Sequence, residues 1–245
     1  MSISDTAIKF ICVISTSVGA LVGSLQSVSS QPITSPYIIS QSPEKPQPPT
    51  GRTASTTDRG DCPAIPKGTP ALTALTPLDA QGVTTTLSQS PTFRFYSPYS
   101  QSKYRFKLYT LDKKEPPLHS QDITLKASAG IFAVSLPTVN AIKPQGYYFW
   151  ELEYLCTEKG SNPVVFGKLY RDQLTSSQKR DFIKAKTPME RIRFYQENGI
   201  WLEMLDEIAK SLPTTRNLWQ KTLDAEILQS ISNKPMIPVN SSTKP

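Results

Sequence analysis

The chain has 245 residues, of which 38% are hydrophobic, and a formal net charge of +7. This length is sufficient for a substantial core. Basic residues are spread along the chain and form no block that could follow a phosphate backbone, so we expect no nucleic-acid partner. A single histidine, His119, excludes a histidine-based triad and a multi-histidine metal site. We therefore predict no catalytic residue, no metal and no cofactor.

Residues 1–30 have the features of an export signal. Lys9 precedes an apolar segment, and small residues follow as far as Ser30, where a signal peptidase could cleave before Gln31. A retained membrane anchor is the alternative, although the purely apolar run is short for a membrane span. We expect the signal to be removed, which would leave no membrane span and place the protein in the periplasm, outside the cell or at the cell surface.

Two segments are too polar to order themselves by burying apolar surface. Residues 31–61 are rich in proline, serine and threonine, and we predict a disordered linker there. A proline-based docking motif is the alternative interpretation of this segment. Residues 232–245 are predicted to form a disordered tail.

Removal of the signal leaves two cysteines, Cys62 and Cys156. An even pair in an exported protein favours a disulfide, with two unrelated buried thiols as the alternative. Closing so long a loop would stabilise the fold by about 4–5 kcal/mol on the chain-entropy account.

Between residues 62 and 172, turn residues separate short alternating runs at the spacing typical of β-sandwiches. The expected strands cover residues 92–96, 103–108, 122–125, 131–136, 145–156 and 164–170. We predict an α+β fold in which an immunoglobulin- or fibronectin-like antiparallel β-sandwich, residues 62–172, precedes a small helical subdomain, residues 173–231.

The most aromatic stretch is residues 145–156, the expected central strand. Period-two alternation turns one face, which includes Tyr148 and Trp150, toward the core. The spacing of Tyr148 from upstream Pro144 and Ile142 is typical of a tyrosine corner, in which the hydroxyl bonds to upstream backbone. The opposite face of this strand is the predicted binding surface, and it carries Tyr147, Phe149, Glu151 and Glu153. To this surface we add Trp201 from the helical part.

Residues 173–231 change to helical periodicity. Thr175 opens one capping box, and Thr187 with Pro188 and Glu190 opens a second. A helix should end at Asn198-Gly199. Two further helices should carry Trp201 and Trp219, packed on the sandwich or on each other. Residues 191–212 also resemble one tetratricopeptide unit, so a peptide-binding groove is an alternative, although such stacks need about three units.

Several motifs together resemble the domain-of-unknown-function family 928, over residues 59–228. They are Arg59 to Pro63, Leu72 to Leu75, Pro91 to Tyr99, Gly130 to Pro137, Tyr148 to Cys156 and Glu197 to Trp201. The resemblance implies an exported protein of the kind found mainly in cyanobacteria, with no established activity. Where the family tends to have Gly-Trp, this chain has Gly167-Lys168, so a pocket or interface that the tryptophan lines would be altered.

These observations favour a non-enzymatic exported envelope protein that binds a protein partner or a surface polymer. The alternative is a carboxylate-based hydrolase acting on cell-surface glycans, with Glu151 and Glu153 as candidate acids. We expect these two glutamates to pair across strands with Lys103, Arg105 or Lys107 instead. The sequence leaves the oligomeric state open.

Overall fold

The computed structural model describes residues 62–77, 83–111, 116–126, 128–138, 142–156, 162–226 and 228–242. All of them belong to one compact unit, Lys45–Pro245. The predicted signal peptide and linker, residues 1–30 and 31–61, lie outside the described residues.

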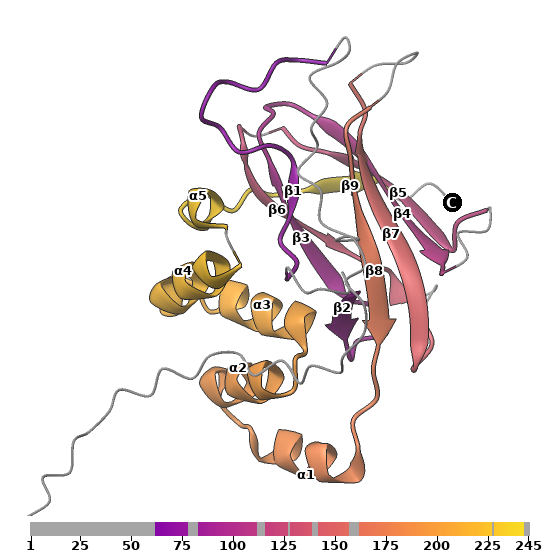
Figure 1. The fold of residues 1–245 in the computed structure, drawn as a ribbon, viewed down its shortest axis with the longest axis vertical. Helices are drawn as coiled ribbons and strands as arrows, with labels where there is room; N and C mark the ends of the chain where they lie inside the picture. The colour runs from indigo at the N-terminus through magenta and orange to yellow at the C-terminus, as the bar shows by residue number, and fades with distance from the viewer. Residues whose placement is uncertain are drawn as a thin grey trace, which may run out of the picture. The chain divides into compact units, whose positions relative to one another are not determined.

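The described strands form two sheets (Figure 1). The three-stranded sheet has the order β1-β3-β6 and the six-stranded sheet the order β2-β8-β7-β4-β5-β9. The strands are β1 (Thr73–Ala74), β2 (Val83–Thr86), β3 (Thr92–Ser97), β4 (Lys103–Thr110), β5 (His119–Thr124), β6 (Gly130–Ser135), β7 (Gly146–Tyr154), β8 (Val164–Arg171) and β9 (Asn240–Ser242). The fold is therefore α+β with a β-sandwich-like core, and the strands expected between residues 92 and 170 are confirmed with small changes in their ends.

One pairing differs from the expected all-antiparallel arrangement. Strand β2 runs parallel to β8, with Val83 opposite Lys168 and Thr86 opposite Arg171. Parallel strands must be joined by a long connection. The five strands between β2 and β8 in the sequence provide one. The prediction of a purely antiparallel sandwich is wrong at this edge.

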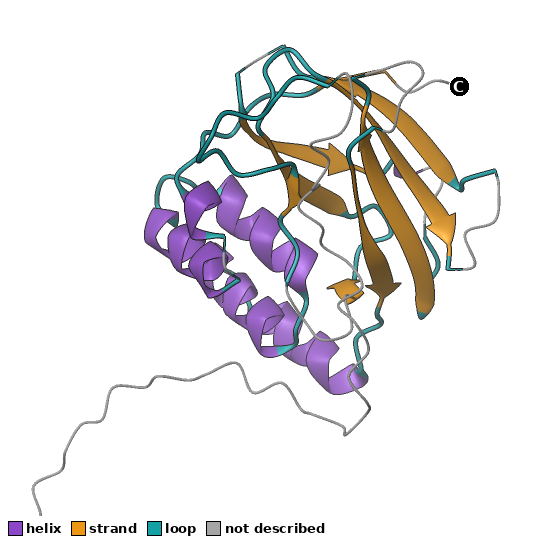
Figure 2. Ribbon diagram, turned by 45° about the horizontal axis from the view of Figure 1, so that its top comes forward, coloured by secondary structure: helices purple, strands orange, loops and turns teal. Residues whose placement is uncertain are grey.

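The two sheets, drawn as orange strands in Figure 2, pack against each other. Aromatic rings from both sheets meet between them. The Trp150 ring centroid lies 5.6 Å from those of both Phe93 and Phe95, and Phe106 lies 5.1 Å from Phe93. Trp150 is 1% exposed, as the alternation predicts for a core residue. Aromatic rings at these separations add attraction to the burial of their large apolar surfaces.

Two local features fix the central strand. The Lys143 amide donates to Tyr148 Oη at 2.7 Å, which confirms the backbone bond expected of a tyrosine corner. On the neighbouring strand, Gly167 lies opposite Trp150. A Cβ atom at position 167 would come within 2.6 Å of Trp150 Cζ2, so the indole occupies space that only glycine leaves free.

Five helices follow the main strands in the described residues. They are α1 (Ser176–Lys184), α2 (Pro188–Glu197), α3 (Trp201–Lys210), α4 (Arg216–Ala225) and α5 (Gln229–Ser232). Both predicted capping boxes are present, at Thr175 and Thr187. Asn198 caps the end of α2, and Gly199 has a φ of 66°, where glycine relieves steric strain.

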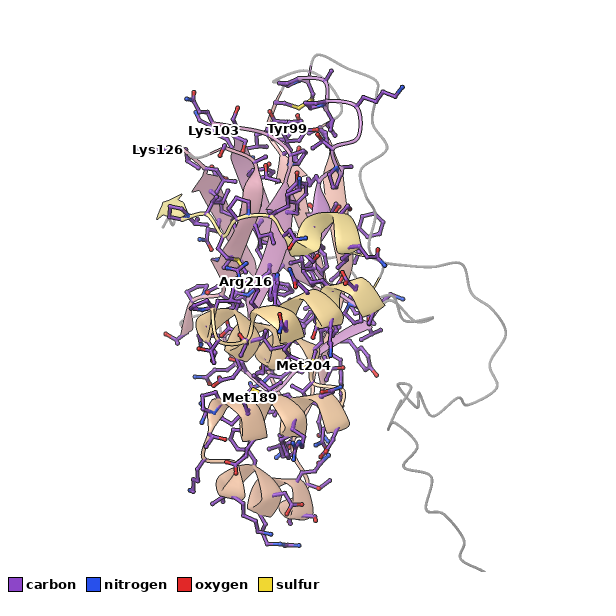
Figure 3. The ribbon with its side chains drawn as sticks, turned by 90° about the vertical axis from the view of Figure 1, so that its left-hand side faces the viewer. Tyr99, Lys103, Lys126, Met189, Met204 and Arg216 are labelled. Carbon is purple, nitrogen blue, oxygen red and sulfur yellow. A yellow bond between two sulfur atoms is a disulfide. The ribbon has the colours of Figure 1, made fainter. Side chains whose placement is uncertain are left out.

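The helices lie next to one another in chain order, α1 beside α2, α2 beside α3 and α3 beside α4, with Met189 and Met204 marking α2 and α3 in Figure 3. Helix α3 also contacts β2 and β3. Buried residues of the helices and of both sheets form one continuous hydrophobic core. Within the described residues, no helix has the length and apolar character that crossing a bilayer requires.

The predicted disordered tail is wrong for residues 232–242. The Ile131 amide donates to Pro235 O and the Ile237 amide donates to Ile131 O, both at 2.7 Å. Strand β9 then pairs antiparallel with β5. The tail satisfies its backbone groups on the edges of β6 and β5, and Ile237 packs against the core. A polar sequence is thus ordered by strand edges that lie far from it in the chain.

Candidate functional site

Aromatic side chains form a row on the outer face of β7 and β8. We call this row, Tyr147, Phe149, Phe166 and Tyr170, the aromatic strip. The ring centroids of Tyr147 and Tyr170 are 4.5 Å apart and those of Phe149 and Phe166 are 5.7 Å apart. Tyr147 is 51% exposed and the other three rings are partly exposed. Adjacent antiparallel strands place the rings side by side because residues on one face of the pair are neighbours.

Lys168 interrupts the strip. It lies on β8 between Phe166 and Tyr170 and pairs in register with Phe149. It is two residues away from each of these aromatic residues along the strand, so its side chain lies on the same face of the sheet as theirs. This is the position at which the resemblance described above led us to expect tryptophan. The departure therefore places a cation within the row of rings.

The predicted surface residues Glu151 and Glu153 have separate partners. Glu151 Oε1 accepts a hydrogen bond of 3.0 Å from Tyr109 Oη and lies 3.5 Å from Lys107 Nζ. This confirms the expected cross-strand pairing of Glu151. Glu153 lies opposite Arg105 in register, but its Oε1 accepts from Asn162 Nδ2 at 2.8 Å. The structure thus assigns the two carboxylates to different neighbours.

Trp201 does not join this surface. It is 3% exposed, and its Nε1 donates to Leu75 O at 2.8 Å, just beyond β1. The first turn of α3 presents the indole to the sandwich, which confirms packing on the sandwich and excludes Trp201 from an exposed binding face. Trp219 is also buried, and its Nε1 donates to Ser232 O.

The predicted disulfide is present. Cys62 and Cys156 are bonded, with their Cα atoms 5.2 Å apart, within the usual range. The bond joins the first described residues to the chain just after β7.

A cleft that the sequence analysis missed opens where β2 and β8 end and the helices begin. We call it the junction cleft; its volume is about 440 Å³. Its walls include Leu87, Arg171, Leu174, Lys179 and Phe182. A more polar cavity of about 240 Å³ adjoins it, and both share Ser88, Tyr195 and Glu203.

Glu203, in the first turn of α3, anchors the wall between these cavities. Its Oε1 accepts hydrogen bonds from Thr86 Oγ1 at 2.5 Å, Leu87 N at 3.0 Å and Ser88 N at 2.8 Å. Burial raises the pKa of the Glu203 carboxyl, and these hydrogen bonds oppose the shift. Sequence reasoning missed this residue, although a lone acid within the apolar run Ile200–Leu205 was a usable signal.

The remaining acids of α3 are paired with cations. Asp206 contacts Arg94 and lies 2.6 Å from Lys210 Nζ. Glu207 accepts from Arg191 Nε at 3.1 Å. Burial, with nearby carboxylates, raises the pKa of Tyr195 to about 12, so its hydroxyl stays protonated at neutral pH. In the described part of the chain, no group of three or more His, Cys, Asp or Glu side chains could hold a metal ion.

Comparison with solved structures gives a weak similarity. The chain is similar to the one titled "Crystal Structure of the Periplasmic Chaperone SfaE", with 13% sequence identity and a TM-score of 0.28. The similarity covers 45% of this chain and 63% of the chaperone chain, so it spans less than two thirds of the chaperone's length. No curated protein matches the chain.

Comparison with protein families gives a more extensive match. The family described as Domain of Unknown Function (DUF928) matches residues 54–236, which is more than half of the chain. The match includes both sheets except β9, all five helices and the lining of the junction cleft. The protein therefore belongs to the DUF928 family.

Proposed function

We propose that the protein is a non-enzymatic exported envelope protein that binds a surface polymer through the aromatic strip. The export features of residues 1–30 support a location in the periplasm or at the cell surface. The Cys62–Cys156 disulfide supports the same location, because disulfides persist in oxidising compartments.

We further propose that the sandwich is immunoglobulin- or fibronectin-like. Two packed sheets, the corner bond of Tyr148 and the buried Trp150 support this assignment. Such a fold supplies a rigid sheet and no reaction, so any binding function depends on the residues that the sheet displays.

The observation that carries the proposed function is the pairing of rings across β7 and β8, one exposed and three partly exposed. A row of rings fixed on a rigid sheet offers flat apolar faces that lose little side-chain freedom on binding. The carbon faces of sugar rings stack on such surfaces, while their hydroxyl groups can donate to carboxylates. Glu151 lies on the same outer face, but its Oε1 already accepts from Tyr109 Oη, so the rings provide the main contact of the proposed site.

The test is sedimentation of the purified protein with insoluble envelope polysaccharide. We expect Tyr147→Ala and Phe149→Ala each to weaken binding about tenfold or more. Leu118→Ala is the matched control, since Leu118 is 43% exposed but lies outside the strip. Because Lys168 replaces an aromatic position of the resembled family, Lys168→Trp should strengthen binding.

Two results would overturn the proposal. One is equal binding by the strip variants and the Leu118→Ala control. The other is a glycan-hydrolysing activity that Glu151→Ala or Glu153→Ala abolishes, which would favour the carboxylate-based hydrolase. A bound component that protease treatment destroys would identify a protein partner in place of a polymer.

A further inference from the structure

The junction cleft has the size of a small-molecule site. Its volume of about 440 Å³ lies within the range typical of ligand pockets. It shares no residue with the aromatic strip. Its walls include residues that follow β2, Arg171 at the end of β8, the segment after β8, and residues of α1, α2 and α3.

Two cations line the cleft without a carboxylate partner. Arg171 donates from Nε to Leu87 O at 3.3 Å and from Nη1 to Ile142 O, so neutral carbonyl groups hold its guanidinium in place. Lys179 is exposed on α1. No salt bridge within the described residues joins either cation to an acid. Both cations therefore line the cleft without an ion-pair partner among the described residues.

The two carboxylates of the cleft already accept hydrogen bonds from the protein. Asp172 Oδ1 accepts from the Gln173 amide at 2.7 Å. Glu203 Oε1 accepts from one hydroxyl and two backbone amides. Burial raises the pKa of Glu203 and so favours its neutral form, which leaves Asp172 as the acid that most opposes an anionic ligand in the cleft.

Apolar side chains form the rest of the wall. Leu87, Leu174 and Phe182 are partly exposed where they line the cleft. The Phe182 ring is fixed by Phe194 and Tyr195, with ring centroids 5.2 Å and 5.7 Å away. The cleft thus places two cations that have no ion-pair partner among the described residues beside an apolar wall.

We propose that the junction cleft binds a small-molecule monocarboxylate with an apolar tail. The carboxylate contacts Lys179 and Arg171, and the tail lies along Leu174 and Phe182. A bidentate bond from Arg171 is not required, because a charge-assisted bond to the Lys179 ammonium provides the main attraction.

Isothermal titration of the full chain with decanoate tests this inference, with decanol as the uncharged probe. We expect saturable binding of one decanoate per chain, at least tenfold tighter than decanol. Lys179→Glu should weaken decanoate binding about tenfold or more and leave decanol unchanged. Phe182→Ala should weaken both probes, with its folding checked by circular dichroism.

Lys184→Glu is the matched control because it makes the same charge change on the same helix. The Lys184 side chain is 76% exposed and does not line the junction cleft. Equal losses in Lys179→Glu and Lys184→Glu would show a general charge effect and overturn the inference, as would the absence of saturable decanoate binding. Neither result bears on polymer binding by the aromatic strip, which is measured separately.

Discussion

Strand β3 takes part in two interfaces of opposite character. Alternation turns Phe93 and Phe95 toward the six-stranded sheet, where they meet Trp150, and turns Arg94 toward α3, where it meets Asp206. We call the first contact the sheet–sheet interface. We call the contacts of α3 with β2, β3 and Leu75, the residue that follows β1, the helix–sheet interface. It includes the Glu203 bonds and the Trp201 bond to Leu75 O.

The difference shows two ways of holding elements together in one core. The sheet–sheet interface is apolar, so its strength depends on volume and packing and changes little with pH. The helix–sheet interface adds directed polar bonds, so its strength depends on the protonation of a buried carboxyl and on individual donors.

The largest effect is expected at the sheet–sheet interface. Trp150→Ala should lower the free energy of unfolding by about 3–5 kcal/mol, because it removes a fully buried ring and leaves a cavity. Urea unfolding followed by circular dichroism measures this change, which should be similar at acid and neutral pH. Tyr147→Ala, on the other face of the same strand, is the control and should change stability by no more than about 0.5 kcal/mol.

A smaller effect, with a distinct pH dependence, is expected at Glu203. Glu203→Ala should cost about 1–3 kcal/mol, because the donors of Thr86, Leu87 and Ser88 lose their acceptor. Burial raises the folded-state pKa of Glu203 above its ordinary value of 4.5, so the folded state binds the proton more tightly than the unfolded state. The resulting stabilisation is complete below the ordinary value and is lost as pH rises through the raised value.

Glu203→Gln isolates this pH effect, since glutamine keeps an acceptor oxygen but cannot ionise. Unfolding free energies measured from acid to neutral pH should fall less steeply for Glu203→Gln than for the unsubstituted protein. Parallel pH profiles for the two proteins would show that the Glu203 pKa is not raised in the folded state.

The smallest effect is expected at Trp201. Trp201→Phe removes the Nε1 donor to Leu75 O while keeping an aromatic ring, so it should cost about 1 kcal/mol. Thermal unfolding measures this cost. The reference variant is Trp219→Phe, which loses a bond to Ser232 O within the helical part. If Trp201→Phe costs as much as Trp150→Ala, the two interfaces would not differ as described.

Local sequence signals predicted much of the fold. Alternation identified β7 with its inward Trp150, and side-chain chemistry identified the capping boxes at Thr175 and Thr187. Each of these depends on residues a few positions apart. The aromatic strip was predicted in part for the same reason, since Tyr147 and Phe149 share one strand.

Features assembled from distant segments were not predicted. The short polar strand β2 has no strong pattern of its own and forms by pairing with β8. Strand β9 similarly depends on the edge of β5. The junction cleft brings residues near position 87 together with residues near 171, 179 and 203, and no local pattern connects them. Trp201 was assigned to a surface because helical periodicity identifies a buried face without identifying what covers it.

The Cys62–Cys156 bond also determines how the molecule carries mechanical load. When the chain is pulled at its two ends, tension passes through the shortest covalent path, which crosses from Cys62 to Cys156. The backbone between these cysteines, including β1 to β7, is bypassed. Force is instead borne from residue 156 onward, by β8, the helices and β9. In the oxidised protein, stretching would therefore first detach β9, the helices or β8 and leave the looped strands without tension along their backbone.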